Sequence, residues 1–159
     1  MKLTIELVPR TSWHSSVRAC VSKGEWDIIR RATYHKAGYR CEICGGVGDA
    51  HPVECHEIWE YDDENHIQKL VGLIALCPKC HHVKHIGYAS ISGKLEEAKG
   101  QLIKVNDIDA IAARIYVLDA FDVWEKRSLH KWEIDISLLE DEFGIVPQGA
   151  LDNGGIPRK

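Results

Sequence analysis

Cys41-Glu42-Ile43-Cys44 and Cys77-Pro78-Lys79-Cys80 are two C-x-x-C pairs that bracket the stretch of sequence that decides the fold. The two-residue spacer lets both sulfurs of a pair reach one ion. Because the chain shows no signal peptide, we expect reduced cysteines that bind metal rather than disulfides. Four thiolates close a tetrahedral shell, so the two pairs together predict a structural Zn²⁺ site. An iron–sulfur cluster or a redox dithiol is the alternative.

Histidines accompany the cysteines. His81 and His85 lie four residues apart in a helix predicted to start at Pro78, so both imidazoles can address one cation from one helix face. His56 lies on a predicted strand between the two pairs, and an imidazole titrates near neutral pH, as a general base requires. A base beside a metal is the arrangement of a hydrolytic site. The alternative is a histidine packed inside a hairpin.

Over about residues 26–87, these motifs resemble the HNH endonuclease superfamily, in particular its cysteine-bearing members. The resemblance implies a ββα-metal, treble-clef-like core that hydrolyses phosphodiester bonds in DNA, and it suggests a bacterial or phage origin. It places His56 at the general base. It places His81 and His85 at a divalent catalytic ion, which would be Mg²⁺, Mn²⁺, Ni²⁺ or Zn²⁺, and the four cysteines at the structural zinc.

Two positions depart from the family pattern. The middle Asn of the pattern falls on Gly72, and the residue before the catalytic histidine, usually a metal-ligating Asp or His, is Cys55. A thiolate ligates zinc well and magnesium poorly, so we expect either Cys55 at a zinc-like ion or a carboxylate from Glu54 or Glu57. A catalytically inactive zinc module that binds nucleic acid or a protein is therefore the alternative function. A toxin or defence nuclease controlled by a partner is a third.

Sequence signals around this core predict an α+β fold. Ser22 and Glu25 form a capping box that starts a helix over about residues 23–37. Residues 52–59 and 68–76 are two apolar runs that predict a hairpin. Helical periodicity then predicts further helices over residues 94–104 and 107–126.

The ends of the chain carry alternating apolar residues. Residues 2–8 and 132–138 predict N- and C-terminal strands, and we expect these strands to pair with each other. The chain is predicted to form one domain over residues 1–150, with the C-terminal helices and strand in residues 94–142. Residues 151–159 are rich in Gly and Pro and predict a disordered tail.

Charge is unevenly distributed along the chain, whose net charge is −4. Basic residues outnumber acids in residues 1–50, so we expect DNA to meet this half, with phosphate contacts from Arg30, Arg31, Lys36 and Arg40. Plain solvation of a helix is the alternative. Acids dominate residues 107–142, which predict either a protein interface or ordinary core packing. No long apolar run suggests a membrane span, and a cytoplasmic location is expected.

Overall fold

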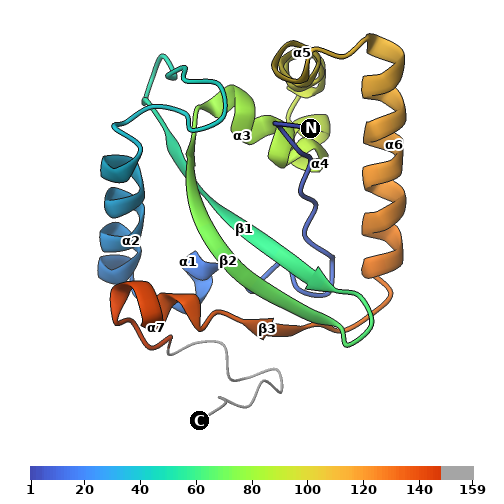
Figure 1. Ribbon diagram of the computed structural model, residues 1–159. Helices are drawn as coiled ribbons and strands as arrows, with labels where there is room; N and C mark the ends of the chain where they lie inside the picture. Colours follow the sequence, from blue (N-terminus) through green and yellow to red (C-terminus); the bar gives the residue numbers. More distant parts are fainter. Residues whose placement is uncertain (148–159) are drawn as a thin grey trace.

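The computed structural model describes residues 1–147 and has an α+β architecture. A long hairpin crosses the molecule, with α2 on one side of it and α6 on the other (Figure 1). The elements in chain order are α1 (Val17–Cys20), α2 (Lys23–Lys36), β1 (Glu54–Asp62), β2 (Ile67–Leu76), α3 (Pro78–Lys84), α4 (Ile86–Ile91), α5 (Leu95–Asn106), α6 (Ala110–Arg127), β3 (Glu133–Asp135) and α7 (Leu138–Phe143).

The hairpin predicted from the two apolar runs is confirmed. β1 and β2 are antiparallel, with Glu54 opposite Leu76 at one end and Asp62 opposite Ile67 at the other. The register shifts by one residue between Ile58 and Trp59, which is a β-bulge. The helix predicted at Pro78 follows β2 directly, with Pro78 in its first turn. Strand, strand and helix therefore follow one another as predicted.

The predicted pairing of the two chain ends is wrong. β3 runs parallel to β2 and extends the sheet in the order β1-β2-β3, while residues 2–8 form no strand. Side chains from α5 and α6 meet the backbone of this N-terminal segment instead. Asn106 Oδ1 accepts hydrogen bonds from the amides of Lys2 and Leu3, and the Tyr116 hydroxyl accepts one from Ile5. With these donors satisfied, the segment needs no strand partner.

The alternation of apolar and polar residues in this segment nevertheless predicts correctly which side chains are buried. Leu3 and Ile5 are buried among residues of α3, α4 and α5, including Val83, Ile86 and Leu102. A second buried cluster joins α1, α2, β2 and α7 on the other side of the hairpin. The two clusters hold α3 against α5 and α2 against the hairpin, and these are the elements that carry the candidate site residues.

Helix α2 starts as its sequence predicts. The Ser22 hydroxyl accepts a hydrogen bond from the Glu25 amide at 3.3 Å, and the Glu25 carboxylate accepts one from the Ser22 amide at 2.7 Å. This reciprocal capping box satisfies two amides that a helix start leaves free. Ile29 and Thr33 face inwards, so the opposite side of α2 faces solvent.

The remaining helices also lie close to their predicted ranges, as α5 and α6. Of the predicted strand at residues 132–138, only Glu133–Asp135 is extended into the sheet, and α7 begins at Leu138. Within the described residues, no helix is both long enough and apolar enough to cross a membrane. The predicted tail at 151–159 lies outside the described residues.

Candidate metal centres and an adjoining groove

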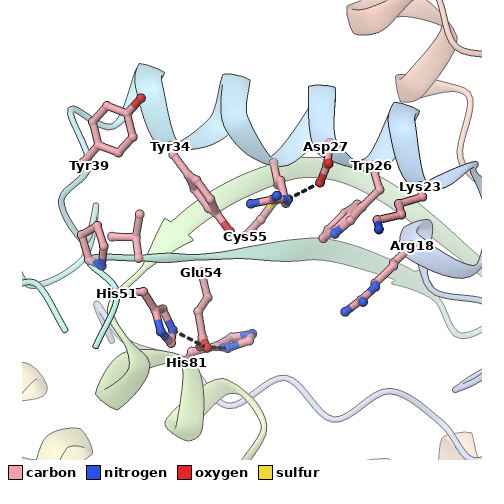
Figure 2. A pocket seen from close by; sticks show the side chains of 13 residues that line it. Arg18, Lys23, Trp26, Asp27, Tyr34, Tyr39, His51, Glu54, Cys55 and His81 are labelled. Atoms are coloured by element: carbon pink, nitrogen blue, oxygen red, sulfur yellow. Dashed lines mark hydrogen bonds and ion pairs between the residues drawn. The ribbon is translucent and has the colours of Figure 1, made fainter. Parts of the chain in front are cut away.

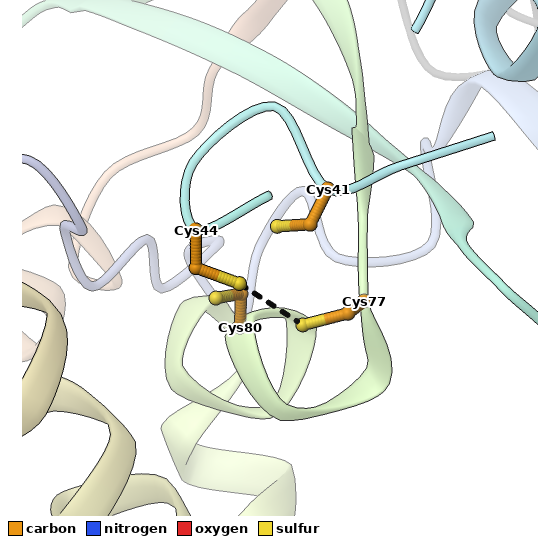
Figure 3. A group of neighbouring side chains, drawn as sticks. All are labelled: Cys41, Cys44, Cys77 and Cys80. Carbon is orange, nitrogen blue, oxygen red and sulfur yellow. Dashed lines mark hydrogen bonds between the residues drawn. The ribbon is translucent and has the colours of Figure 1, made fainter. Parts of the chain in front are cut away.

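The four paired cysteines come together at one end of the hairpin. Cys41 and Cys44 lie in the loop that follows α2, Cys77 precedes α3, and Cys80 lies in its first turn (Figure 3). Their sulfur atoms all lie within 4.8 Å of one another, and the Cys44 and Cys77 sulfurs are 3.6 Å apart. A tetrahedron with Zn–S bonds of about 2.3 Å has edges of about 3.8 Å. The arrangement therefore fits a structural zinc ion.

Nearby N–H groups also suit thiolates at this site. The Gln101 side-chain amide lies 3.2 Å from the Cys80 sulfur, and the Gly46 amide lies 3.4 Å from the Cys44 sulfur. Donors of this kind stabilise and orient ligated sulfur. The turn between the first two cysteines depends on Gly45, whose φ of 73° favours glycine. The other cysteines, Cys20 and Cys55, do not belong to this group.

Three histidines form a second group of candidate ligands. His56 comes from β1, His81 from α3, and His85 from the residue that ends α3, and their nearest ring nitrogens all lie within 4.8 Å of one another. His56 Nδ1 and His85 Nε2 are 3.1 Å apart. The three rings meet edge to face, with centroids 4.6 to 5.3 Å apart. Three imidazoles directed at one point form a potential three-ligand metal site.

Two carboxylates bind the outer nitrogens of these rings. His56 Nε2 lies 2.9 Å from Glu6, and His81 Nδ1 lies 2.5 Å from Glu54. A carboxylate on the far nitrogen of a metal-ligating histidine fixes its tautomer and raises its basicity. The inner nitrogens, His56 Nδ1 and His81 Nε2, are left to face the centre of the group.

Glu6 is a member of this site that the sequence did not indicate. It lies in the N-terminal segment, where strand alternation only marked it as polar, and it also binds the buried Lys84 ammonium of α3. Glu54 was considered in the sequence as a possible metal ligand, but its carboxylate contacts the histidines His81 and His51. Both carboxylates thus lie around the three-histidine group rather than within it.

The pKa values of His56, His85, Glu6 and Glu54 are shifted in directions that suit metal binding. Burial lowers the pKa of His56, and burial together with the neighbouring His56 and His81 lowers the pKa of His85 to about 3. The hydrogen bond from His81 lowers the pKa of Glu54 to about 2. Burial would raise the pKa of Glu6, but His56 and Lys84 lower it to about 2. Neutral imidazoles and ionised carboxylates are the forms that suit a metal site.

The low pKa of His85 predicts how pH affects the protein when the histidine site holds no metal. The unfolded imidazole titrates near pH 6.5, whereas the folded one stays neutral until about pH 3. Between these values the unfolded state binds one more proton, so the free energy of unfolding falls as pH drops below about 6.5. This single group contributes about 1.4 kcal/mol per pH unit.

The measurement is an NMR titration of the histidine rings in protein loaded with one zinc at the cysteines. We expect the His85 ring shifts to stay constant between about pH 7.5 and about pH 5.5. Exposed His35, on the outer side of α2, serves as the comparison. A His85 ring that titrates near pH 6.5 would contradict the buried neutral state.

Cys55 lines the cavity of the three histidines but does not belong to their group of candidate ligands. Adjacent residues of a strand point to opposite faces, and the Cys55 sulfur lies 3.7 Å from the Thr33 hydroxyl of α2. Burial raises the pKa of this thiol to about 11, which keeps it protonated at neutral pH. The predicted thiolate ligand therefore lies against α2, outside the group of three histidines.

The four predicted phosphate contacts separate into different environments. Arg30 lines a groove of about 910 Å³ between α2 and β1, which His81 also lines (Figure 2). Arg31 and Lys36 are exposed on α2 and do not line this groove. Arg40 donates a hydrogen bond to the Gly45 carbonyl at 3.0 Å and so braces the cysteine loop. A second cavity, of about 240 Å³, is lined by the three histidines together with Glu57.

No protein-family model, no curated protein and no solved structure matches the chain. The fold and site thus define an α+β protein with a four-cysteine cluster and a three-histidine cluster, joined through α3. Membership of the HNH superfamily stays a prediction.

Proposed function

We propose that the protein is a metal-dependent endonuclease that hydrolyses phosphodiester bonds in DNA. The observation that carries this proposal is the convergence of His56, His81 and His85 on one point that borders a groove with cationic side chains. Three protein ligands leave positions on an ion for water and for a phosphate oxygen. Neutral imidazoles favour Zn²⁺ or Ni²⁺ over Mg²⁺ as the bound ion.

We further propose that His56 is the third metal ligand rather than the general base. Its Nε2 is engaged by Glu6, and its Nδ1 faces His85 at 3.1 Å. In the HNH pattern, the general base directly follows a metal ligand on the first strand of the hairpin. If His56 is that ligand, the residue at the base position is Glu57. Glu57 lines the cavity of the three histidines, and its oxygens accept hydrogen bonds from the Val17 amide at 2.7 Å and the Trp59 indole at 3.1 Å. Burial raises its pKa, the direction a proton acceptor near neutral pH requires.

In this scheme each residue of the site has a separate role in the hydrolysis. A divalent ion held by the three histidines would stabilise the negative charge that develops on the phosphate. Glu57 would accept a proton from the attacking water as the water oxygen forms its bond to phosphorus. The bond from phosphorus to the leaving oxygen then breaks, and this oxygen takes a proton from solvent. Glu6 and Glu54 hold the imidazoles of His56 and His81 in the tautomers that face the ion.

The test of this function is plasmid nicking by protein prepared without added metal and then supplied with Zn²⁺, Ni²⁺, Mn²⁺ or Mg²⁺. The wild type is expected to nick supercoiled DNA with at least one of these ions. Nicking by the His81→Ala variant is expected to stay at the background rate. His82→Ala is the matched control, because His82 adjoins His81 on α3 but faces Glu97 of α5 at 3.4 Å. Equal nicking by His81→Ala and wild type would refute the assignment.

The alternative function is a zinc module without catalysis. Gly72 favours it, because this residue lies in β2 opposite Ile58 and has no side chain with which to replace the Asn of the family pattern. A wild-type protein that binds DNA but nicks none of it with any of the four ions would establish this alternative.

A protein partner for the acidic C-terminal region also remains a proposal. On α6, Ile111, Ile115 and Leu118 repeat at helical spacing and are exposed by 73%, 53% and 59%. Exposed apolar stripes of this kind often mark interaction surfaces. A partner that regulates the nuclease would be expected to cover this face of α6.

A further inference from the structure

The groove between α2 and β1 combines positive charge with aromatic rings. Three cationic side chains line it: Arg18 of α1, and Lys23 and Arg30 of α2. Three aromatic side chains also line it: Trp26, Tyr34 and Tyr39. Figure 2 shows Lys23, Trp26 and Tyr34 descending from α2 on one side, with Glu54 and His81 on the other.

The carboxylates at the groove offset only part of this positive charge. Asp27 is paired with Arg30, whose Nε lies 2.7 Å from the carboxylate. Glu54 accepts hydrogen bonds from His51 and His81, at 2.8 Å and 2.5 Å. Each acid thus has a local partner, while Arg18 and Lys23 are exposed cations at the rim. The groove is suited to an anionic ligand with several charges.

The groove is continuous with the three-histidine cavity. The two share Arg18, Trp26, Cys55 and His81 as lining residues. A polyanion that follows the groove therefore reaches the three histidines at one end, with Trp26 beside it at the junction. This continuity makes the groove a path to the site rather than a separate pocket.

We propose that this groove binds single-stranded nucleic acid and delivers it to the histidine site. The proposal rests on the proposed nuclease function and names its substrate class. Phosphates meet Arg18, Lys23 and Arg30, while bases stack on the aromatic rings. Bases can stack in this way only when they are unpaired. A groove of about 910 Å³ has room for a few nucleotides of one strand. A duplex needs much more space, because its major groove alone is about 12 Å wide.

The test is fluorescence anisotropy with the full chain and labelled oligonucleotides, without added divalent metal. The probes are a 12-nucleotide DNA strand, the RNA of the same sequence, and the DNA duplex. We expect at least one single strand to bind about tenfold more tightly than the duplex. Three phosphate contacts predict a slope of log K against log salt of about −2. Comparison of the DNA and RNA strands then identifies the sugar.

Paired variants show whether binding uses this groove. Arg30→Ala is expected to weaken single-strand binding about fivefold and to reduce the salt slope by about 0.7, whereas Arg31→Ala, on the outer side of α2, should bind as the wild type does. Trp26→Ala is expected to weaken binding about tenfold. Trp13→Ala is its control, because Trp13 is 70% exposed and does not line the groove. Circular dichroism checks that each variant is folded.

Two outcomes would overturn the proposal: a duplex that binds as tightly as both single strands, or an Arg31→Ala variant that loses as much affinity as Arg30→Ala. These outcomes differ from failure of the nuclease function. Tight single-strand binding without cleavage of the bound strand, with any of the four ions, would refute catalysis and leave the groove assignment standing. Nicking with a preference for the duplex would do the reverse.

Discussion

Replacing Cys77 with serine is expected to abolish the cooperative folding of the hairpin and α3. Cys77 is buried, and its sulfur is one of four that surround a single point between the loop after α2 and the start of α3. A structural zinc site contributes about 10 to 16 kcal/mol of apparent binding free energy, and a whole domain is stable by only about 5 to 15 kcal/mol. Loss of one ligand from a closed shell therefore removes most of the net stability.

Thermal melting followed by circular dichroism and zinc content by elemental analysis would measure this effect. Cys20→Ser is the matched control: Cys20 is as buried as Cys77, with 4% exposure, but it packs among Val17, Ile29 and Leu139 away from the cluster. The control should keep its zinc and lose only about 1 to 3 kcal/mol for a buried hydroxyl. A Cys77→Ser protein that melts like the wild type and keeps its zinc would show that the cluster is not a zinc site.

His56→Ala is expected to remove both the second metal ion and the nuclease activity. His56 is one of the three candidate ligands that the described residues bring together, and its side chain is 4% exposed, so no surface side chain can easily replace it. Metal analysis should therefore fall from two ions per chain to one, the cysteine-bound zinc. Nicking should fall at least about 100-fold, because loss of even outer partners of a metal site costs about 10-fold to 100-fold.

Metal content distinguishes the two roles considered for His56. A general base can be removed without loss of the ion, so a His56→Ala protein that keeps two metals and loses activity would return His56 to the base role. Glu57→Gln gives the complementary result. It should keep both metals and lose nicking by about 10²-fold to 10⁴-fold, as removal of a proton acceptor does.

Local patterns in the sequence predicted the parts of the fold whose contacts are local. The two C-x-x-C pairs, the hairpin and the helix at Pro78 lie within residues 41–85, and each follows from spacing, alternation or a capping signal. The capping box of α2 was equally readable, because Ser22 and Glu25 are three residues apart.

The errors concern contacts between distant segments. The alternation of apolar and polar residues predicted the buried faces of residues 2–8 and 132–138. It does not predict which strand of the sheet has an edge free to pair. The edge of β2 was available to β3, and the N-terminal segment found Asn106 and Tyr116 instead. The contact between Glu6 and His56 likewise joins residues 50 positions apart, and no local sequence pattern predicts it.

The rotation of α2 about its axis explains why the basic residues alone could not predict which side chains line the groove. Arg30 and Arg31 are neighbours in sequence, but successive helical residues point about 100° apart. Only the packing of Ile29 and Thr33 against the hairpin decides that Arg30 faces the groove. The same argument separates His81 from His82 on α3.

The N-terminal segment implies that the cysteine cluster and the histidine cluster form at different stages of synthesis. All four cysteines have left the ribosome once the chain has grown past Cys80 by the length of the exit tunnel, so a zinc ion could bind them while the chain is still growing. The amides of Leu3 and Ile5 have no partners until Asn106 and Tyr116 emerge. Glu6 can contact His56 and Lys84 earlier, but the backbone on its N-terminal side is fixed only when α5 and α6 have been translated, so the histidine cluster reaches its final packing late.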